Sequence, residues 1–238
     1  MSQLKIFVAY MVHAFTALGA VLGLLTLYAI YKQEYILTFW YMAGTIVIDA
    51  VDGTLARLVD IKKIAPRIDG ELLDNIIDYL NYVITPAFFL MTADLLPPSW
   101  ILVVPALVVL ASAYQFTQSD AKTADHFFKG FPDYWNIVVF YLFVWHTSPQ
   151  LNVWLLLALV VLVFVPIKYV YPSRMEYVTG SNNLRHILLL ATILWGIVTA
   201  AMLVTYPQIN PWFNYYSFGY CAFYALLSLY RTFIPMNR

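Results

Sequence analysis

Eight long apolar stretches follow one another along this chain of 238 residues, and they constrain its fold more than any other feature. A helix needs about 20 predominantly apolar residues to cross the hydrocarbon core of a bilayer. The apolar runs are continuous rather than alternating, which argues against a transmembrane β-barrel. We therefore expect an all-α, polytopic integral membrane protein that forms a single domain over residues 1–238. Its eight expected transmembrane helices cover residues 7–31, 35–57, 73–94, 99–117, 133–147, 151–171, 184–206 and 211–234.

The composition agrees with a chain that is surrounded by lipid. Hydrophobic residues make up 62% of the sequence and charged residues 11%. A soluble domain carries about 45–50% apolar and about 25% charged residues. This scarcity of charge argues against an ordinary soluble enzyme and against a nucleic-acid-binding protein, so we expect no nucleic acid among the partners.

The basic residues are distributed unevenly between the two sides of the expected membrane. If the N-terminus is cytoplasmic, 12 of the 13 Lys and Arg residues fall at cytoplasmic helix ends or loops, and Lys32 alone falls on the opposite side. Cytoplasmic connections of membrane proteins are enriched in Lys and Arg. The bias supports the count of eight helices and predicts that both termini are cytoplasmic.

Four aspartates lie near the end of the second apolar stretch and the beginning of the third. A short loop joins these two ends, so they lie on the same side of the expected membrane. Asp49 and Asp52 are three residues apart and share one stripe of a helix. Asp74 and Asp78 are four residues apart and share a stripe of the next helix. Carboxylates in a membrane are costly and usually functional, and four of them in one small volume repel one another. Divalent cations relieve this repulsion, and carboxylate oxygens favour Mg²⁺, Mn²⁺ or Ca²⁺ over Zn²⁺. We therefore expect these four carboxylates to hold two metal ions.

Small residues accompany the aspartates on both stripes. Gly53 and Ala56 lie beside the first pair, and Gly70 lies beside the second. Residues with little or no side chain let a bulky ligand approach the backbone, although small residues in membrane helices also serve close helix packing. Arg57 adds a planar guanidinium that suits a phosphate. Together with metal ions, this arrangement indicates a pyrophosphate site at the membrane surface.

The order D-x-x-D-G-x-x-A-R followed by G-x-x-x-D-x-x-x-D, over residues 49–78, resembles the signature of the CDP-alcohol phosphotransferase family. Pro86, which follows the signature, is a further and less specific match to the family pattern. The spacer between the two parts, residues 58–69, is longer than in most members. This spacer, the chain length, the eight expected helices and the stretch 114–132 resemble the branch of the bacterial phosphatidylcholine synthases.

The resemblance implies transfer of the phosphatidyl group of CDP-diacylglycerol to choline, which gives phosphatidylcholine and CMP. It implies two divalent cations, Mn²⁺ or Mg²⁺, as cofactors, and it makes Asp78 both a metal ligand and the general base. It also implies a bacterial inner membrane with the active site on the cytoplasmic side, where CDP-diacylglycerol, choline and membrane lipid are the partners. A homodimer is compatible with the sequence. The residues implied to bind the nucleotide are Asp52, Gly53, Ala56, Arg57 and Gly70.

Candidates for binding choline and the lipid phosphate are more dispersed. Aromatic faces recognise a quaternary ammonium, but Tyr and Trp are also common as belt residues at membrane interfaces. His13 on the first helix either faces the site or is a core histidine. The main candidates are Tyr79, Asn81, Tyr82, Tyr114, Asp120, Lys122 and Arg174, and the further aromatic candidates are Tyr134, Trp135, Tyr171 and Tyr177.

Two other functions stay open at this point. The same enzyme chemistry could use serine, inositol or glycerol phosphate as the acceptor, although a phosphorylated acceptor would require more cationic residues around its pocket. A divalent-cation transporter would also place carboxylates in a membrane. Against transport, the four aspartates gather at one face of the membrane, and no Asp, Glu, Lys, Arg or His lies between Asp78 and Asp94 near the other face.

Overall fold

The computed structural model of the chain describes residues 3–171 and 178–234. Helices dominate these residues, and a two-stranded antiparallel sheet is the only sheet among them. Three of the helices are long and apolar enough to cross a membrane, namely Gln3–Tyr31, Pro98–Thr117 and Asn182–Thr205. The chain divides into two compact units, of which Met1–Val109 with Tyr134–Phe143 is the first and Leu110–Asp133 with Val144–Arg238 is the second.

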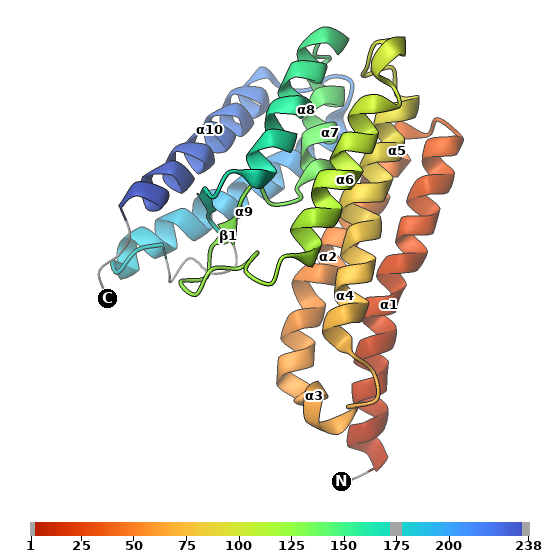
Figure 1. Cartoon of the computed structure of the whole chain (residues 1–238), viewed down its shortest axis with the longest axis vertical. Coiled ribbons are helices and arrows are strands. Elements are labelled where there is room, and N and C mark those ends of the chain that lie inside the picture. The colour runs from red at the N-terminus through yellow and green to blue at the C-terminus, as the bar shows by residue number, and fades with distance from the viewer. Residues whose placement is uncertain (1–2, 172–177, 235–238) are drawn as a thin grey trace. The chain divides into compact units, whose positions relative to one another are not determined.

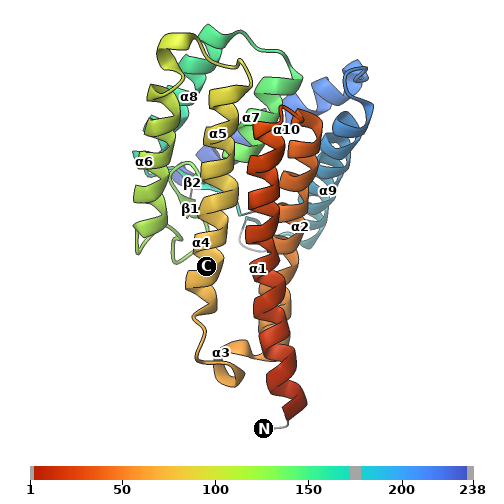
Figure 2. The same cartoon turned by 90° about the vertical axis from the view of Figure 1, so that its right-hand side faces the viewer.

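The first unit is built on two long helices and a helical rod of three pieces. The helices α1 (Gln3–Tyr31) and α2 (Tyr35–Val59) lie side by side, as Figure 1 and Figure 2 show. The rod runs along α1 and consists of α4 (Gly70–Asp78), the π-helical segment η1 (Tyr79–Ile84) and α5 (Thr85–Thr92). The other elements of this unit are α3 (Ile61–Ile64), η2 (Pro98–Trp100), the first half of α6 (Val103–Thr117) and nearly all of α7 (Trp135–Val144).

Two glycines of α1 allow the rod to approach closely. A Cβ atom at Gly19 would lie 2.7 Å from Cγ2 of Ile77, and one at Gly23 would lie 2.6 Å from Oδ1 of Asn81. The side-chain amide of Asn81 donates a hydrogen bond to the carbonyl oxygen of Gly19 at 3.0 Å. Small residues at helix contacts are typical of membrane proteins. Here they hold the rod, with two of the predicted metal ligands, against α1.

The connection between α2 and α4 is fixed by its own caps and contacts. Asp60 ends α2 in a left-handed conformation with φ of 53°, and Ile61 of α3 packs with Ala9 and Val12 of α1. The Asp69 side chain then accepts hydrogen bonds from the first backbone N–H groups of α4, at 3.1 and 3.0 Å. Such an N-cap stabilises the start of a helix, so α4 begins at a defined residue.

The second unit contains α8 (Pro149–Phe164), α9 (Asn182–Thr205), α10 (Pro211–Phe233) and the second half of α6. Its small sheet joins β1 (Phe128–Lys129) to β2 (Lys168–Tyr169), with Phe128 opposite Tyr169. Gly130 follows β1 with φ of +81°, and a Cβ atom there would lie 2.1 Å from the carbonyl oxygen of Val163. Only glycine fits this close approach, which fastens the segment before α7 to the end of α8.

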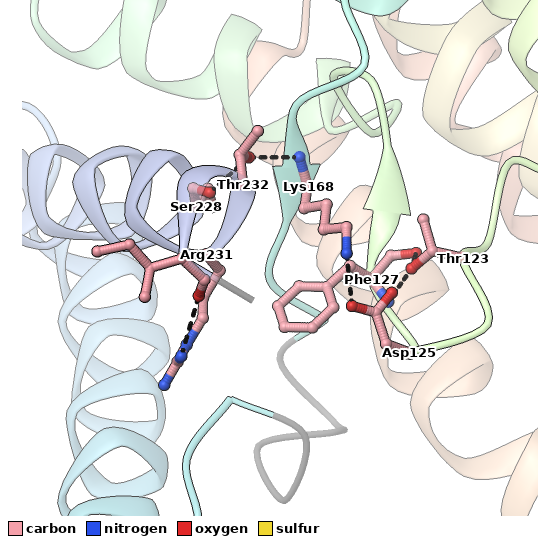
Figure 3. A network of polar contacts seen from close by, with 8 residues as sticks. Thr123, Asp125, Phe127, Lys168, Ser228, Arg231 and Thr232 are labelled. Atoms are coloured by element: carbon pink, nitrogen blue, oxygen red, sulfur yellow. Dashed lines mark hydrogen bonds and ion pairs between the residues drawn. The ribbon is translucent and has the colours of Figure 1, made fainter. Parts of the chain in front are cut away.

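The strand β2 is tied to α10 and to the loop before β1, as Figure 3 shows. The backbone N–H of Lys168 donates to Oγ1 of Thr232 at 2.8 Å, and its ammonium contacts Asp125 at 2.6 Å. The backbone N–H of Val170 donates to Oγ of Ser228 at 3.3 Å. Side chains of α10 therefore hold the β2 segment, and Lys168 of β2 in turn holds the loop before β1.

Each of the eight expected stretches coincides with a helix or with the rod, so the all-α class is confirmed. The expectation that residues 151–171 are helical throughout is wrong. The helix α8 ends at Phe164, because Pro166 cannot continue a helix and residues 168–169 pair with β1. The stretch 133–147 is also less helical than expected, since α7 has 10 residues. Eight membrane spans and two cytoplasmic termini stay predictions.

Candidate metal and nucleotide site

Three of the predicted metal ligands converge in the first unit. Asp49 comes from α2, and Asp74 and Asp78 come from successive turns of α4. One carboxylate oxygen from each lies within 4.8 Å of the other two. Asp49 is exposed, while Asp74 and Asp78 are half-buried. A set of anionic oxygen donors this close together fits a hard divalent cation, so the residues present suit the predicted cofactor.

Asp52, the fourth predicted ligand, is not a member of the group formed by Asp49, Asp74 and Asp78. It is buried, with 5% of its surface exposed, and Thr16 of α1 is a hydrogen-bonding partner of its carboxylate. A spacing of three residues keeps Asp49 and Asp52 on one side of α2, and the contact with Thr16 directs the Asp52 carboxylate toward α1. The role of Asp52 in binding metal or nucleotide stays a prediction.

A contact that the sequence analysis did not anticipate links Tyr82 to this group. The Tyr82 hydroxyl donates a hydrogen bond to Oδ2 of Asp49 at 2.8 Å. Tyr82 belongs to η1, the segment that follows Asp78. Its spacing of four residues from Asp78 was the available signal, since it continues the row of Asp74 and Asp78 along the rod.

Gly53 and Arg57 share an open stretch of α2. The nearest atom to a Cβ placed at Gly53 would be Nη1 of Arg57, at 3.5 Å. Arg57 is exposed, and its guanidinium donates a hydrogen bond to Oγ1 of Thr54 at 3.1 Å. This surface leaves room for a ligand beside an accessible cation. Ala56 differs, because it packs on the apolar cluster that includes Ile61, and close packing alone accounts for its small size.

Gly70, the first residue of α4, is in contact with His13 of α1. A Cβ atom at Gly70 would lie 2.9 Å from Cε1 of the His13 ring. His13 is 6% exposed, and its Nε2 makes no hydrogen bond within the described part of the chain. The ring therefore gives a packing reason for glycine at position 70. The predicted role of Gly70 in binding the nucleotide is separate from this packing role and stays a prediction.

Three candidates for the choline site are held by other contacts or buried in the first unit. The Tyr79 hydroxyl donates to the carbonyl oxygen of Val109 at 3.0 Å, and Asn81 is buried against Gly19 of α1. Trp135 is fully buried at the start of α7, so its ring faces are covered by protein. These contacts do not support a role for the three residues in choline binding, which stays a prediction.

Tyr134 directly precedes Trp135 in the first unit, and the other candidates belong to the second unit. Tyr114 lies 5.0 Å from Phe164 between ring centroids and lines a cavity of about 240 Å³ together with Lys129. The carboxylate of Asp120 contacts the Lys129 ammonium at 2.5 Å, and this hydrogen bond lowers the pKa of Asp120. Lys122 pairs with Phe128 through its backbone. Arg174 and Tyr177 lie outside the described residues.

Comparison with known proteins adds an independent finding. The sequence model of a family described as "CDP-alcohol phosphatidyltransferase" matches residues 9–165, which include the three-carboxylate group. A protein of Legionella pneumophila named "Phosphatidylcholine synthase" is 51% identical over 231 residues, which are 97% of this chain and 91% of that protein. A protein of the same name from Borreliella burgdorferi is 31% identical over 240 residues and 100% of both chains. Another from Rhizobium meliloti is 33% identical over 204 residues, 86% of this chain and 82% of that protein.

Proposed function

We propose, since the chain belongs to the CDP-alcohol phosphatidyltransferase family, that it transfers the phosphatidyl group of CDP-diacylglycerol to choline. The products are phosphatidylcholine and CMP. The observation that carries the proposal is the three-carboxylate group, whose oxygens lie within 4.8 Å of one another inside the region that matches the family. The choice of choline is supported by relatives named phosphatidylcholine synthase that match nearly the whole chain.

The carboxylates of Asp49, Asp74 and Asp78 would hold the divalent cations, with Asp52 as a further predicted ligand. Mn²⁺ and Mg²⁺ both accept such oxygen ligands. Bound there, divalent cations stabilise negative charge on the pyrophosphate and on the departing CMP phosphate. Gly53 and Arg57 supply open space and a guanidinium beside the carboxylates on α2, which suits the phosphate groups of the nucleotide.

The transfer itself requires a base. The choline hydroxyl oxygen attacks the phosphorus that carries diacylglycerol, the bond from that phosphorus to the CMP oxygen breaks, and the hydroxyl proton must leave. The Asp78 carboxylate accepts this proton in the proposed mechanism. Positioned bases of this kind accelerate reactions by about 10²–10⁴-fold. Asp78 is half-buried and lies on the same α4 row as Asp74, so the helix backbone sets the distance between the Cβ atoms of the two residues.

The proposed placement is a bacterial inner membrane, with eight spans, two cytoplasmic termini and the site on the cytoplasmic side. Within residues 3–171 and 178–234, three helices meet the length and hydropathy of a membrane span, and the other expected stretches are helical over most of their length. The excess of Lys and Arg in alternate connections supports the orientation. In that placement the nucleotide stays at the aqueous edge while the acyl chains remain in lipid.

The function is tested by measuring CMP release from CDP-diacylglycerol by the purified full chain in detergent with Mn²⁺. Choline, serine, inositol and glycerol 3-phosphate are supplied in separate reactions. We expect release with choline and little with the others. Release with serine alone would contradict the choline assignment, and release with none of the four alcohols would contradict the enzyme assignment.

A further inference from the structure

Tyr82 occupies an unusual place on the rod that carries two of the three clustered carboxylates. It belongs to η1 (Tyr79–Ile84), a π-helical segment that begins directly after Asp78. π-Helical turns are rare and occur frequently at functional sites. The side chain of Tyr82 is half-buried. The segment therefore presents a polar group next to the carboxylates instead of continuing a uniform α-helix.

The hydroxyl of Tyr82 is directed at Asp49. It donates to Oδ2 of Asp49 at 2.8 Å, and its charged neighbours are Asp49, Asp78 and Asp74. A tyrosine hydroxyl has one proton to donate, whereas a carboxylate has about four lone-pair positions. Asp49 can therefore accept the bond from Tyr82 and still present an oxygen to a cation.

The three carboxylates differ in how they are held. Asp74 and Asp78 stand four residues apart on one helix, so the backbone of α4 fixes their relative positions. Asp49 reaches the group from α2 and is exposed, so its oxygen can take up the same position only if its side-chain torsions are constrained. The bond from Tyr82 supplies such a constraint from the same rod that carries the other two.

We propose that Tyr82 is a positioning residue whose hydroxyl holds the Asp49 carboxylate in the orientation that completes the group with Asp74 and Asp78. The proposal rests on the proposed function, since it assumes that the group binds divalent cations. Groups that orient metal ligands typically contribute about 10–100-fold to metal affinity. It also gives Tyr82 a different task from choline binding, and the two tasks predict different measurements.

The chain offers a matched control on the same segment. The Tyr79 hydroxyl donates to the backbone carbonyl of Val109 at 3.0 Å, so Tyr79→Phe and Tyr82→Phe each remove one hydroxyl and one hydrogen bond from η1. Mn²⁺ binding to each purified full-chain variant is measured without substrate, from the electron paramagnetic resonance signal of free Mn²⁺. The Michaelis constant for choline is measured separately at saturating Mn²⁺.

We expect Tyr82→Phe to raise the dissociation constant for Mn²⁺ roughly 10–100-fold and Tyr79→Phe to leave it unchanged. The Michaelis constant for choline at saturating Mn²⁺ is expected to stay near that of the unsubstituted protein in Tyr82→Phe. Unchanged Mn²⁺ affinity in Tyr82→Phe contradicts the proposal, as does an equal loss in the two variants. Unchanged Mn²⁺ affinity together with a raised choline constant would assign Tyr82 to the acceptor instead. Failure of the unsubstituted protein to bind Mn²⁺ would contradict the proposed metal site itself.

A second comparison covers the case in which Tyr82→Phe does not yield folded protein. Without the Tyr82 hydroxyl, the Asp49 carboxylate faces Asp74 and Asp78 with one hydrogen bond fewer, and like charges at short range destabilise one another. Adding Asp49→Asn to Tyr82→Phe removes the charge that the hydroxyl faces. If the Tyr82 hydroxyl acts by holding Asp49, we expect the double variant to fold again. Folding is measured by the size-exclusion profile and the melting temperature. A double variant that remains unfolded contradicts the proposal.

Discussion

Two polar regions of this chain arrange their carboxylates in opposite ways. On α2 and α4, oxygens of Asp49, Asp74 and Asp78 lie within 4.8 Å of one another. In the second unit, Asp120 and Asp125 each contact a lysine ammonium, at 2.5 and 2.6 Å. The first region gathers charges of one sign, and the second joins charges of opposite sign.

The difference separates a binding site from a structural connection. Like charges at short range destabilise one another, and a bound cation relieves that repulsion. Solvent-exposed ion pairs such as those of the second unit contribute little to stability, and they join segments of one chain without any ligand. Substitutions in the first region should therefore affect activity, and substitutions in the second should affect stability by small amounts.

The largest expected effect comes from Asp78→Asn. The amide cannot accept the choline proton, so we expect CMP release to fall by at least about 100-fold. Asp125→Asn, also an aspartate-to-asparagine change, lies in the region of ion pairs and is expected to keep most of the activity. Both are measured as initial rates of CMP release.

Binding of the nucleotide by the same variants sharpens the assignment of the base. Asp78→Asn should spare CDP-diacylglycerol binding more than Asp49→Asn does, because proton transfer is its proposed main task. Equal loss of binding in the two variants would argue that Asp78 acts only as a ligand.

An intermediate effect is expected at Gly70. A Cβ atom there would lie 2.9 Å from the buried His13 ring, and overpacking of this kind costs about 1–3 kcal/mol. Gly70→Ala should therefore lower the melting temperature in detergent. Gly53→Ala is the matched control, since its Cβ would meet only the Arg57 guanidinium at 3.5 Å. It should keep the melting temperature while weakening nucleotide binding, and a melting temperature that falls equally in both would contradict this contrast.

The smallest effect is expected at the Asp120–Lys129 pair. The hydrogen bond from Lys129 lowers the pKa of Asp120 in the folded protein. Its stabilising contribution is therefore present above the unfolded pKa of about 3.9 and is lost as the pH falls through the folded pKa. The melting temperatures of the unsubstituted protein and Lys129→Gln should differ slightly at neutral pH and converge on acidification. A difference that grows on acidification would show that the bond does not act in this way.

The helices could be predicted from the sequence because lipid demands long apolar stretches, and each of these stretches contains a helix. The pairing of Asp74 with Asp78 could be predicted as well, since a spacing of four residues fixes it within one helix. Pro166 marks the end of α8 near Phe164 in the sequence, but the strand that follows could not be predicted, because it pairs with residues 128–129, which are distant in sequence.

The site shows the same limit. Asp52 shares α2 with Asp49, but its carboxylate has a hydrogen-bonding partner, Thr16, on α1. The spacing of residues along one helix does not show which neighbouring helix each side chain meets. The bond between Tyr82 and Asp49 joins residues that are 33 apart in sequence and come from different helices. Its detection required the arrangement of α2 against the rod.

The central claim is that the three-carboxylate group supports a cation-dependent transfer to choline. The most direct measurement follows labelled choline into lipid, using the purified full chain with CDP-diacylglycerol, with Mn²⁺ and after chelation. The account predicts lipid-extractable label that requires CDP-diacylglycerol, disappears on chelation and returns when Mn²⁺ is restored. Absence of labelled lipid, or labelling that persists without divalent cations, would contradict it.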